Sequence, residues 1–258
     1  MKQGIFTLTG KRRLNDTGSE WLLEIEAPEI EASPGRFVNI MIEGHYLRRP
    51  ISVSYYKDGI LNLIVNAVGG GTRRLVETPI GRSLDMLTGL GNCFSVPTET
   101  ADGELVVIGG GIGFAPLVGL LKKISLETDI RPLAVFGFNE KRDVPLYFLQ
   151  ELAEETGCRL EICTMKGDFG RKGNAVACAG EILAERSEKA GYFYACGPMG
   201  MMKAACSAFE SEGELSLEAR MGCGFGACVG CSIRTTEGIK RICKEGPVFK
   251  KSELEYES

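Results

Sequence analysis

The chain has 258 residues, with 30 Lys and Arg against 34 Asp and Glu and a formal net charge of -4 at pH 7. The length favours about two domains with cores of ordinary size. The acidic balance and the lack of a basic block argue against nucleic acid as a partner. No apolar run approaches the roughly 18 residues of a membrane span, and no signal-peptide pattern comes first, so we expect a soluble cytoplasmic protein.

Residues 4–97 have the pattern of an all-β domain. Apolar and β-branched runs separated by turn residues predict antiparallel strands at 5–11, 20–27, 36–42, 51–56 and 60–68. Lys57-Asp58-Gly59 is a hairpin signal between the last two strands. We therefore predict an antiparallel sheet or small β-barrel.

Two motifs in this β domain suggest a ligand that carries phosphate. In Arg49-Pro50-Ile51-Ser52, a guanidinium and a hydroxyl flank a rigid proline, and both groups reach phosphate or a ring carbonyl. The run Gly69-Gly70-Gly71-Thr72 offers free backbone N–H groups for an anion-binding nest. Each motif alone is more often a solvated arginine pair or a plain glycine turn. Their presence in one small domain favours ligand binding.

The middle of the chain alternates between strand and helix patterns, which is typical of a parallel sheet. The expected strands cover residues 105–113, 132–139, 159–165, 191–198 and 216–221. The expected helices cover residues 114–124, 145–157, 175–189 and 199–213, and Gly157 is expected to end the second of them.

A glycine-rich turn joins the first of these strands to its helix. Backbone amides of Gly110, Gly111 and Gly113 would meet a pyrophosphate there, at the start of a helix. Phe114 and Pro116 stand where a third motif glycine would fall, so the usual dinucleotide fingerprint is absent. Such turns also form simply to pack a helix closely on a strand.

A second signal of dinucleotide binding is Cys196-Gly197-Pro198, which ends a later strand. Ligands bind at this carboxyl edge of open α/β sheets, although Cys196 fits a buried core thiol equally well. In the loop after the second strand, Glu140 suits a ribose, while Lys141 or Arg142 suits an added phosphate. The sequence therefore leaves NAD and NADP open.

Four of the ten cysteines, Cys223, Cys228, Cys231 and Cys243, lie near the end of the chain. The first three have the C-x4-C-x2-C spacing of plant-type iron–sulfur sites, and four thiolates fit a 2Fe–2S cluster. A structural zinc site also takes four thiolates, but zinc ribbons usually pair two C-x2-C knuckles and this segment has one. A disulfide framework is disfavoured because no secretion signal is evident. Spacing favours iron–sulfur, with zinc as the alternative.

These motifs together resemble the ferredoxin-NADP reductase superfamily. The sequences RRPIS, GGGT, GGGIGFAPL and CGPM carry that likeness, and the tail sequences MGCGFGACVGC and RICKEGPVF narrow it to the electron-transfer subunits of dihydroorotate dehydrogenase B. The resemblance implies three units: an antiparallel flavin-binding β-barrel at 1–98, a parallel-sheet α/β domain for NAD at 99–215, and a small cysteine-rich iron–sulfur segment at 216–258.

The resemblance also implies a role for individual residues. FAD contacts are expected from Arg49, Pro50, Ile51, Ser52, Ile64, Val65, Asn66, Gly71 and Thr72. The family usually has an aromatic and a basic residue where this chain has Val65 and Asn66, so backbone contacts are expected there. NAD contacts are expected from Gly110, Gly111, Gly113, Cys196, Gly197 and Pro198, with Cys196 as a wall of the nicotinamide site. Cys223, Cys228, Cys231 and Cys243 would hold the 2Fe–2S cluster.

The function implied by the resemblance is electron transfer in pyrimidine biosynthesis. A separate FMN-containing catalytic subunit would oxidise dihydroorotate, and this chain would pass the electrons through the cluster and FAD to NAD, in a heterotetramer of two plus two subunits. The sequence shows no acid–base pair, and none is required of this chain. Two alternatives are a self-standing NAD(P)H reductase for a ferredoxin or another acceptor, and a zinc-stabilised binding module without redox activity.

Overall fold

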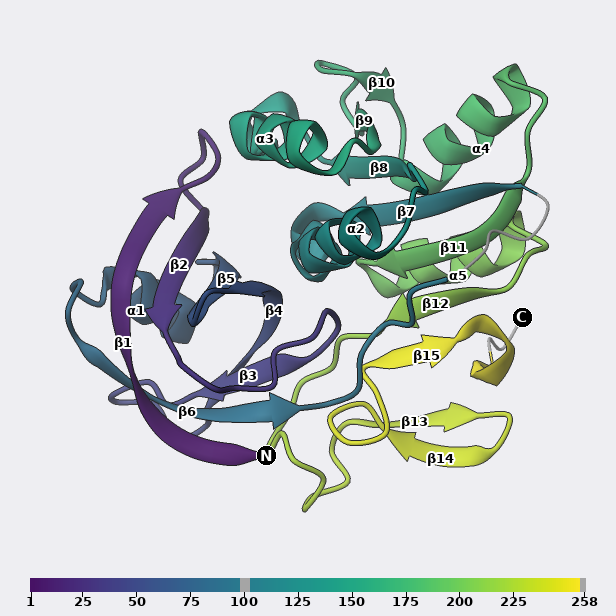
Figure 1. Ribbon diagram of the computed structural model, residues 1–258. Helices are drawn as coiled ribbons and strands as arrows, with labels where there is room; N and C mark the ends of the chain where they lie inside the picture. Colours follow the sequence, from purple (N-terminus) through teal and green to yellow (C-terminus); the bar gives the residue numbers. More distant parts are fainter. Residues whose placement is uncertain (98–102, 256–258) are drawn as a thin grey trace.

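The first part of the chain is a closed antiparallel β-barrel, which confirms the predicted β domain (Figure 1). The structure is a computed structural model that describes residues 1–97 and 103–255. Apolar side chains fill the barrel interior, among them Leu8, Leu23, Val53 and Leu63. In barrel order the strands are β1 (Lys2–Arg13), β2 (Glu20–Glu26), β5 (Ile60–Asn66), β4 (Arg49–Lys57), β3 (Phe37–Ile40) and β6 (Ser83–Leu90).

One of the two turns predicted in the barrel is present in the structure, and the other is replaced by a helix. Asp58 and Gly59 have φ values of 52° and 79°, as the predicted tight hairpin between β4 and β5 requires. The run of three glycines, by contrast, opens a helix, α1 (Gly70–Glu77), which was not predicted. The Thr72 hydroxyl accepts from Gly69 N–H and donates to the Gly69 carbonyl, and this closes the first turn.

The second part is a seven-stranded sheet that is parallel except for its last strand. The order is β10 (Arg171–Lys172), β9 (Arg159–Thr164), β8 (Leu133–Phe138), β7 (Glu104–Gly110), β11 (Ala190–Cys196), β12 (Gly213–Ser216) and β15 (Val248–Lys250). The parallel core confirms the predicted α/β fold. The predicted boundary at residues 98 and 99 lies outside the described residues.

Helices cover both faces of this sheet. On one face, α2 (Ala115–Glu127) and α3 (Leu146–Thr156) share an apolar cluster with β7 and β8. On the other face, α4 (Ala175–Glu185) and α5 (Met199–Ala208) pack through a second cluster. Gly157 adopts φ 67° directly after α3 and ends that helix as predicted.

The predicted helix at 199–213 and strand at 216–221 are wrong in extent. Helix α5 ends at Ala208 because Phe209 turns inward and its ring packs 5.4 Å from that of Phe193. The Lys251 ammonium then binds the Phe209 carbonyl at 2.6 Å. The last parallel strand, β12, therefore begins at Gly213 and is already complete at Ser216.

Two other expected elements are shorter or displaced. The expected helix at 175–189 ends at Glu185, since Ser187 takes a positive φ of 56° and breaks the helix. The expected strand at 105–113 ends at Gly110, and a short 3-10 turn, η1 (Gly111–Phe114), connects it to α2.

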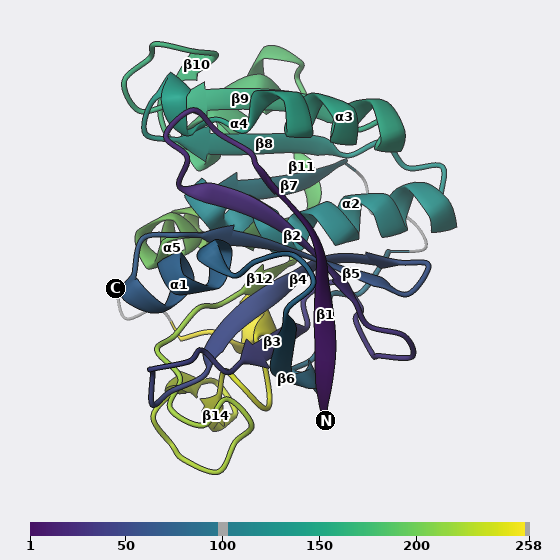
Figure 2. The same ribbon diagram turned by 90° about the vertical axis from the view of Figure 1, so that its left-hand side faces the viewer.

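The cysteine-rich end of the chain lies against both larger parts. Its strand β15 joins the sheet beside β12, and a hairpin of β13 (Ser232–Thr235) and β14 (Gly238–Arg241) follows the three clustered cysteines. Figures 1 and 2 both place this segment next to β3 and β6 of the barrel. The Asn92 amide, just after β6, donates to the Val248 carbonyl at 2.7 Å and accepts from Val248 N–H at 2.9 Å.

No helix in the described ranges is long and apolar enough to cross a membrane.

Candidate functional site

A cavity of about 200 Å³ lies between the barrel and the α/β domain. Its barrel wall contains most of the residues expected to contact FAD: Pro50, Ile51, Ser52, Ile64, Val65, Asn66 and Thr72. The opposite wall is formed by Ile112, Ala115 and Pro116 and by residues that precede the cysteines, among them Leu217 and Met221. We call this space the flavin cavity. Strands β4 and β5 and the start of the helix that follows them thus bring the RRPIS and GGGT motifs to one surface.

Arg49 and Gly71, the other two expected FAD residues, lie together at the start of α1. A Cβ atom on residue 71 would collide with the Arg49 guanidinium, so glycine allows this close approach. The guanidinium and the positive end of the helix together make a site suited to an anion such as a pyrophosphate. Arg48 has a different environment, because its guanidinium binds both carboxylate oxygens of Asp85 at 3.0 Å.

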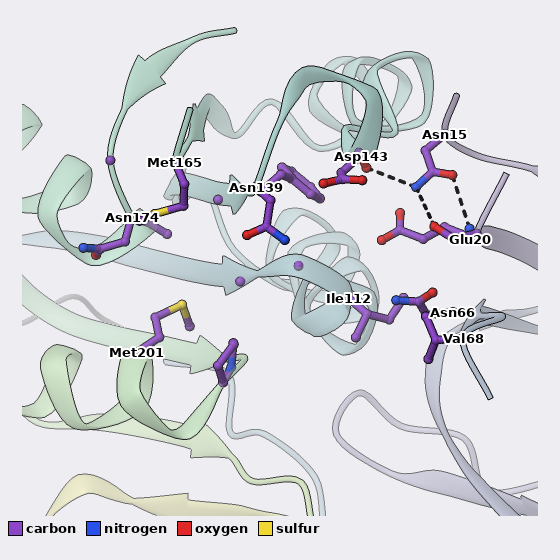
Figure 3. Close-up of a pocket in the computed structure, with 18 residues that line it drawn as sticks. Asn15, Glu20, Asn66, Val68, Ile112, Asn139, Asp143, Met165, Asn174 and Met201 are labelled. Atoms are coloured by element: carbon purple, nitrogen blue, oxygen red, sulfur yellow. Dashed lines mark hydrogen bonds between the residues drawn. The ribbon is translucent and has the colours of Figure 1, made fainter. Parts of the chain in front are cut away.

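A second cavity of about 520 Å³ lies over the carboxyl edge of the sheet (Figure 3). Gly110, Gly111 and Pro198, all expected NAD residues, line it. The rest of the wall comes from sheet loops, including Asn139, Met165 and Asn174, and from the barrel, including Asn15, Ser19, Glu20 and Asn66. We call this space the dinucleotide cavity. Its position at the carboxyl ends of parallel strands is where ligands bind in open α/β sheets.

The remaining expected NAD residues lie beneath this cavity and do not line it. Cys196 is 1% exposed, and burial raises the pKa of its thiol. A Cβ on Gly113 would collide with the Cys196 carbonyl, so the glycine turn sits directly on β11. Gly197 also has little free space, since its Cβ position would lie 2.7 Å from the Met201 methyl group and 3.1 Å from the Gly110 nitrogen. The structure places these residues as supports of the glycine turn.

The loop expected to choose between NAD and NADP forms a short 3-10 turn, η2 (Lys141–Asp143). Glu140 forms an ion pair with Lys166, and the Lys141 N–H donates to the Asp168 carboxylate at 3.0 Å. The loop also touches the barrel, since Asn15 donates to the Asp143 carbonyl at 3.2 Å.

Glu20 was not identified from the sequence as a site residue. It is 3% exposed, it lines the dinucleotide cavity, and its Oε2 has no hydrogen-bond partner among the described residues. Burial, with a smaller contribution from the nearby Asp143 charge, raises the pKa of Glu20 to about 8. The strand pattern gave no signal of this burial, because Glu20 shares its face of β2 with the exposed Glu24 and Glu26, while Leu23 and Ile25 lie on the opposite, core-facing side.

The four cysteines of the tail are arranged as two pairs. The Cys228 N–H lies 3.3 Å from the Cys223 sulfur, and the Cys243 N–H lies 3.5 Å from the Cys231 sulfur. Among the described residues, no group of three or more His, Cys, Asp or Glu side chains is arranged to hold a single metal ion. The contacts pair Cys223 with Cys228 and Cys231 with Cys243, which matches two thiolates for each iron of a 2Fe–2S cluster.

Backbone N–H groups directed at the Cys223 sulfur favour its thiolate form. Burial works to raise the pKa of Cys223, but N–H groups of Cys228, Phe225 and Ala227 outweigh it and lower the pKa to about 6. In the second pair, burial and the neighbouring Cys231 thiol raise the pKa of Cys243 to about 12. Inward N–H groups of this kind also stabilise the sulfurs of a bound cluster.

Residues 222–231, which carry the first three cysteines, are called the cysteine loop. This loop, the flavin cavity and the dinucleotide cavity follow one another in space. Met221, two residues before Cys223, and Pro247, four residues after Cys243, both line the flavin cavity. Asn66 and Ile112 line the flavin cavity and the dinucleotide cavity alike. The loop is fixed to the barrel where Asn39 donates to the Cys223 carbonyl at 3.1 Å.

Comparison with known proteins agrees with this arrangement. Residues 218–255 match the iron–sulfur cluster binding domain of dihydroorotate dehydrogenase B, and residues 107–207 match the oxidoreductase NAD-binding domain. The chain is 34% identical to the dihydroorotate dehydrogenase B (NAD(+)) electron transfer subunit of Enterococcus faecalis, with 98% of each chain covered. It is 32% identical to the subunit of the same name from Shouchella clausii, again with 98% of each covered.

The chain belongs to the family of dihydroorotate dehydrogenase B electron-transfer subunits. It is therefore a subunit of an NAD-dependent oxidoreductase, and the cofactors of this family are FAD, a 2Fe–2S cluster and NAD. The fold agrees: an NADH-dependent reduced ferredoxin-NADP oxidoreductase structure superposes with a TM-score of 0.84 at 24% identity, covering 98% of this chain and 90% of the other. The family resemblance, the fold class and the enzyme class predicted from sequence are confirmed.

Proposed function

We propose that this chain passes electrons from the FMN of a dihydroorotate-oxidising partner through a 2Fe–2S cluster and FAD to NAD. The observation that carries the proposal is the series formed by the cysteine loop, the flavin cavity and the dinucleotide cavity. Asn66 and Ile112 line both cavities, and Met221, two residues before Cys223, lines the flavin cavity. When bound, the cluster carries single electrons and FAD exchanges them for the two-electron hydride of nicotinamide. The protein supplies the alignment of these groups.

Each part of the chain has its own task in this proposal. The barrel, residues 1–98, holds FAD through Arg49–Ser52, Ile64–Asn66, Gly71 and Thr72. The α/β domain, residues 99–215, holds NAD at Gly110, Gly111 and Pro198, with Gly113, Cys196 and Gly197 supporting the turn from below. The segment 216–258 holds the cluster through Cys223, Cys228, Cys231 and Cys243.

The partner is expected to dock over the cysteine loop. Phe225 and Val229 lie between the cysteines and are 43% and 75% exposed, and Met41 is exposed in the barrel loop that follows β3. Large exposed apolar side chains beside the proposed cluster site are suited to contact a partner protein and to exclude water from the interface. We propose an FMN-containing catalytic subunit of dihydroorotate dehydrogenase as this partner, in a cytoplasmic heterotetramer of two plus two subunits.

NAD is the proposed dinucleotide rather than NADP. The Glu140 carboxylate stands at the end of β8, where a carboxylate binds the ribose hydroxyls of NAD and repels an added phosphate. Curated relatives named for NAD(+) support the same choice.

The test is to express the chain alone and with its FMN-containing partner, then assay cofactors and turnover. The proposal expects flavin and iron–sulfur absorption from the chain alone, and dihydroorotate-dependent reduction of NAD only from the complex. Flavin and iron with NADH-driven ferredoxin reduction, and no complex with the partner, would instead indicate a self-standing reductase. A colourless protein containing zinc would reject both.

A further inference from the structure

Glu20 and Asn66 lie side by side on the barrel wall of the dinucleotide cavity. They are paired residues of the adjacent antiparallel strands β2 and β5, and both line the cavity. Figure 3 shows the Glu20 carboxyl directed into this space and Asn66 beside Ile112. Because Asn66 and Ile112 also line the flavin cavity, Asn66 lies where the two cavities meet, and Glu20 lies beside it on the neighbouring strand.

Both side chains have an oxygen without a partner. Glu20 Oε2 and Asn66 Oδ1 are buried, and neither forms a hydrogen bond within the described part of the chain. Leaving a buried polar atom unpaired is energetically costly, so such atoms usually have a ligand or an ordered water as partner. Two of them on one cavity wall indicate a polar binding subsite.

The position of the pair restricts what the subsite binds. Hydride transfer requires the nicotinamide ring against the flavin, so the nicotinamide end of the dinucleotide must lie at the junction of the cavities. We propose that Glu20 and Asn66 bind the nicotinamide riboside half of NAD, through its carboxamide or ribose hydroxyls. This inference rests on the proposed function, because it takes the ligand of the dinucleotide cavity to be NAD.

The chemistry of the pair fits uncharged groups of this kind. The pKa of Glu20 lies at about 8 because of burial and, to a smaller extent, Asp143, so its carboxyl is largely protonated at neutral pH. A protonated carboxyl donates to an amide or hydroxyl oxygen, while Asn66 Oδ1 accepts from an N–H or O–H group. The nicotinamide riboside half has both kinds of group.

A purely structural role for Glu20 makes a different prediction. The loop before β2 contacts the α/β domain, with the Thr17 N–H 3.3 Å from the Arg142 carbonyl and Glu20 N–H 3.3 Å from the Asn15 amide oxygen. If Glu20 only stabilised this contact, its replacement would lower the affinity of the cavity for every ligand equally. If Glu20 belongs to a subsite for one half of NAD, its replacement lowers the affinity only for ligands that contain that half.

The experiment measures the affinity of the FAD-loaded full chain for NAD⁺ and for ADP, which lacks the nicotinamide riboside, by titration calorimetry. Glu20→Leu is expected to weaken NAD⁺ binding about tenfold and to leave ADP binding within about twofold of wild type. Glu20→Gln, whose amide still donates a hydrogen bond, is the matched control and is expected to stay within about threefold for both. Glu20→Met, closer in shape to Glu, replaces the Leu variant if that variant loses FAD.

Three outcomes would overturn the inference: unchanged NAD⁺ affinity in Glu20→Leu, an equal loss for NAD⁺ and ADP, or a tenfold loss in Glu20→Gln for both ligands. Wild-type protein that holds FAD but binds no NAD⁺ would instead contradict the proposed function, so the two failures are distinguishable.

Discussion

The four cysteines proposed to hold the cluster lie within residues 223–243, whereas the wall of the dinucleotide cavity is drawn from segments between Asn15 and Met201. Residues 222–231, which carry the first three cysteines, contain no helix or strand and are shaped by N–H groups directed at sulfur and by the hydrogen bond from Asn39 to the Cys223 carbonyl. The cavity depends instead on the docking of the barrel against a parallel sheet. The cysteine site is therefore local, and replacing a cysteine ligand should damage it most. The dinucleotide cavity is assembled from distant segments, and changes in the packing between those segments should damage it most.

The largest effect is expected at the local site. Cys228→Ala removes a cluster ligand, and we expect turnover from dihydroorotate to NAD in the complex to fall by about three orders of magnitude or more, because the one-electron route is interrupted. Oxidation of NADH by an artificial acceptor that takes electrons from FAD should persist. Cys93→Ala, an exposed cysteine outside the loop, is the control and should retain both activities. If Cys228→Ala kept full turnover with the partner, the cluster would not lie on the route.

A packing change is expected to damage the assembled site. In Gly113→Ala the new methyl group meets the Cys196 carbonyl, and we expect the free energy of unfolding to fall by about 3 kcal/mol, with weaker NAD binding. Gly180→Ala in α4 is the matched control, since its Cβ position has no atom within 4 Å. That helix position should gain about 0.5–1 kcal/mol. Chemical denaturation measures the free energy of unfolding of both variants. If Gly113→Ala were as stable as Gly180→Ala, the close contact between the glycine turn and β11 would be contradicted.

The dinucleotide cavity should also respond to pH through Glu20. Its carboxyl keeps its proton up to a pKa of about 8 in the folded chain, whereas the unfolded chain loses it near the ordinary pKa of 4.5. The folded state therefore binds more protons between these values, and the contribution of Glu20 to stability is lost as the pH rises through this window. Glu20→Gln cannot ionise, so it should match wild type near pH 4 and exceed it by on the order of 3 kcal/mol at pH 9. Denaturation of both proteins across this range measures the difference, and a constant difference would contradict the raised pKa.

The smallest effect concerns the attachment of the cysteine segment to the barrel. Asn92→Ala removes hydrogen bonds to the backbone of Glu245 and Val248, and we expect a loss of about 1–3 kcal/mol in stability. Iron content should remain unchanged, because Asn92 contacts none of the cysteines in these hydrogen bonds. Loss of iron in a folded Asn92→Ala protein would show that the cysteine site also depends on contacts between distant segments, as the dinucleotide cavity does.

The contrast between the two sites explains how far the sequence alone was informative. The cysteines were identified because their ligand spacing is local, and the RRPIS and GGGIG motifs because each marks one turn or strand end. Glu20 and Asn15 were missed because they reach the dinucleotide cavity only when the loop before β2 meets η2. The helical start at Gly70 was missed because a run of glycines has low helix propensity, and the Thr72 hydroxyl and the barrel surface overcome it.

The order of the cofactors is tested most directly by adding NADH under anaerobic conditions to the chain with its cluster intact, with FAD bound or removed, and recording electron paramagnetic resonance after rapid mixing. The account predicts that the reduced 2Fe–2S signal appears quickly when FAD is present and is absent or greatly slowed when FAD has been removed. Equally rapid cluster reduction without FAD, or reduction of FAD that never reaches the cluster, would contradict the proposed route.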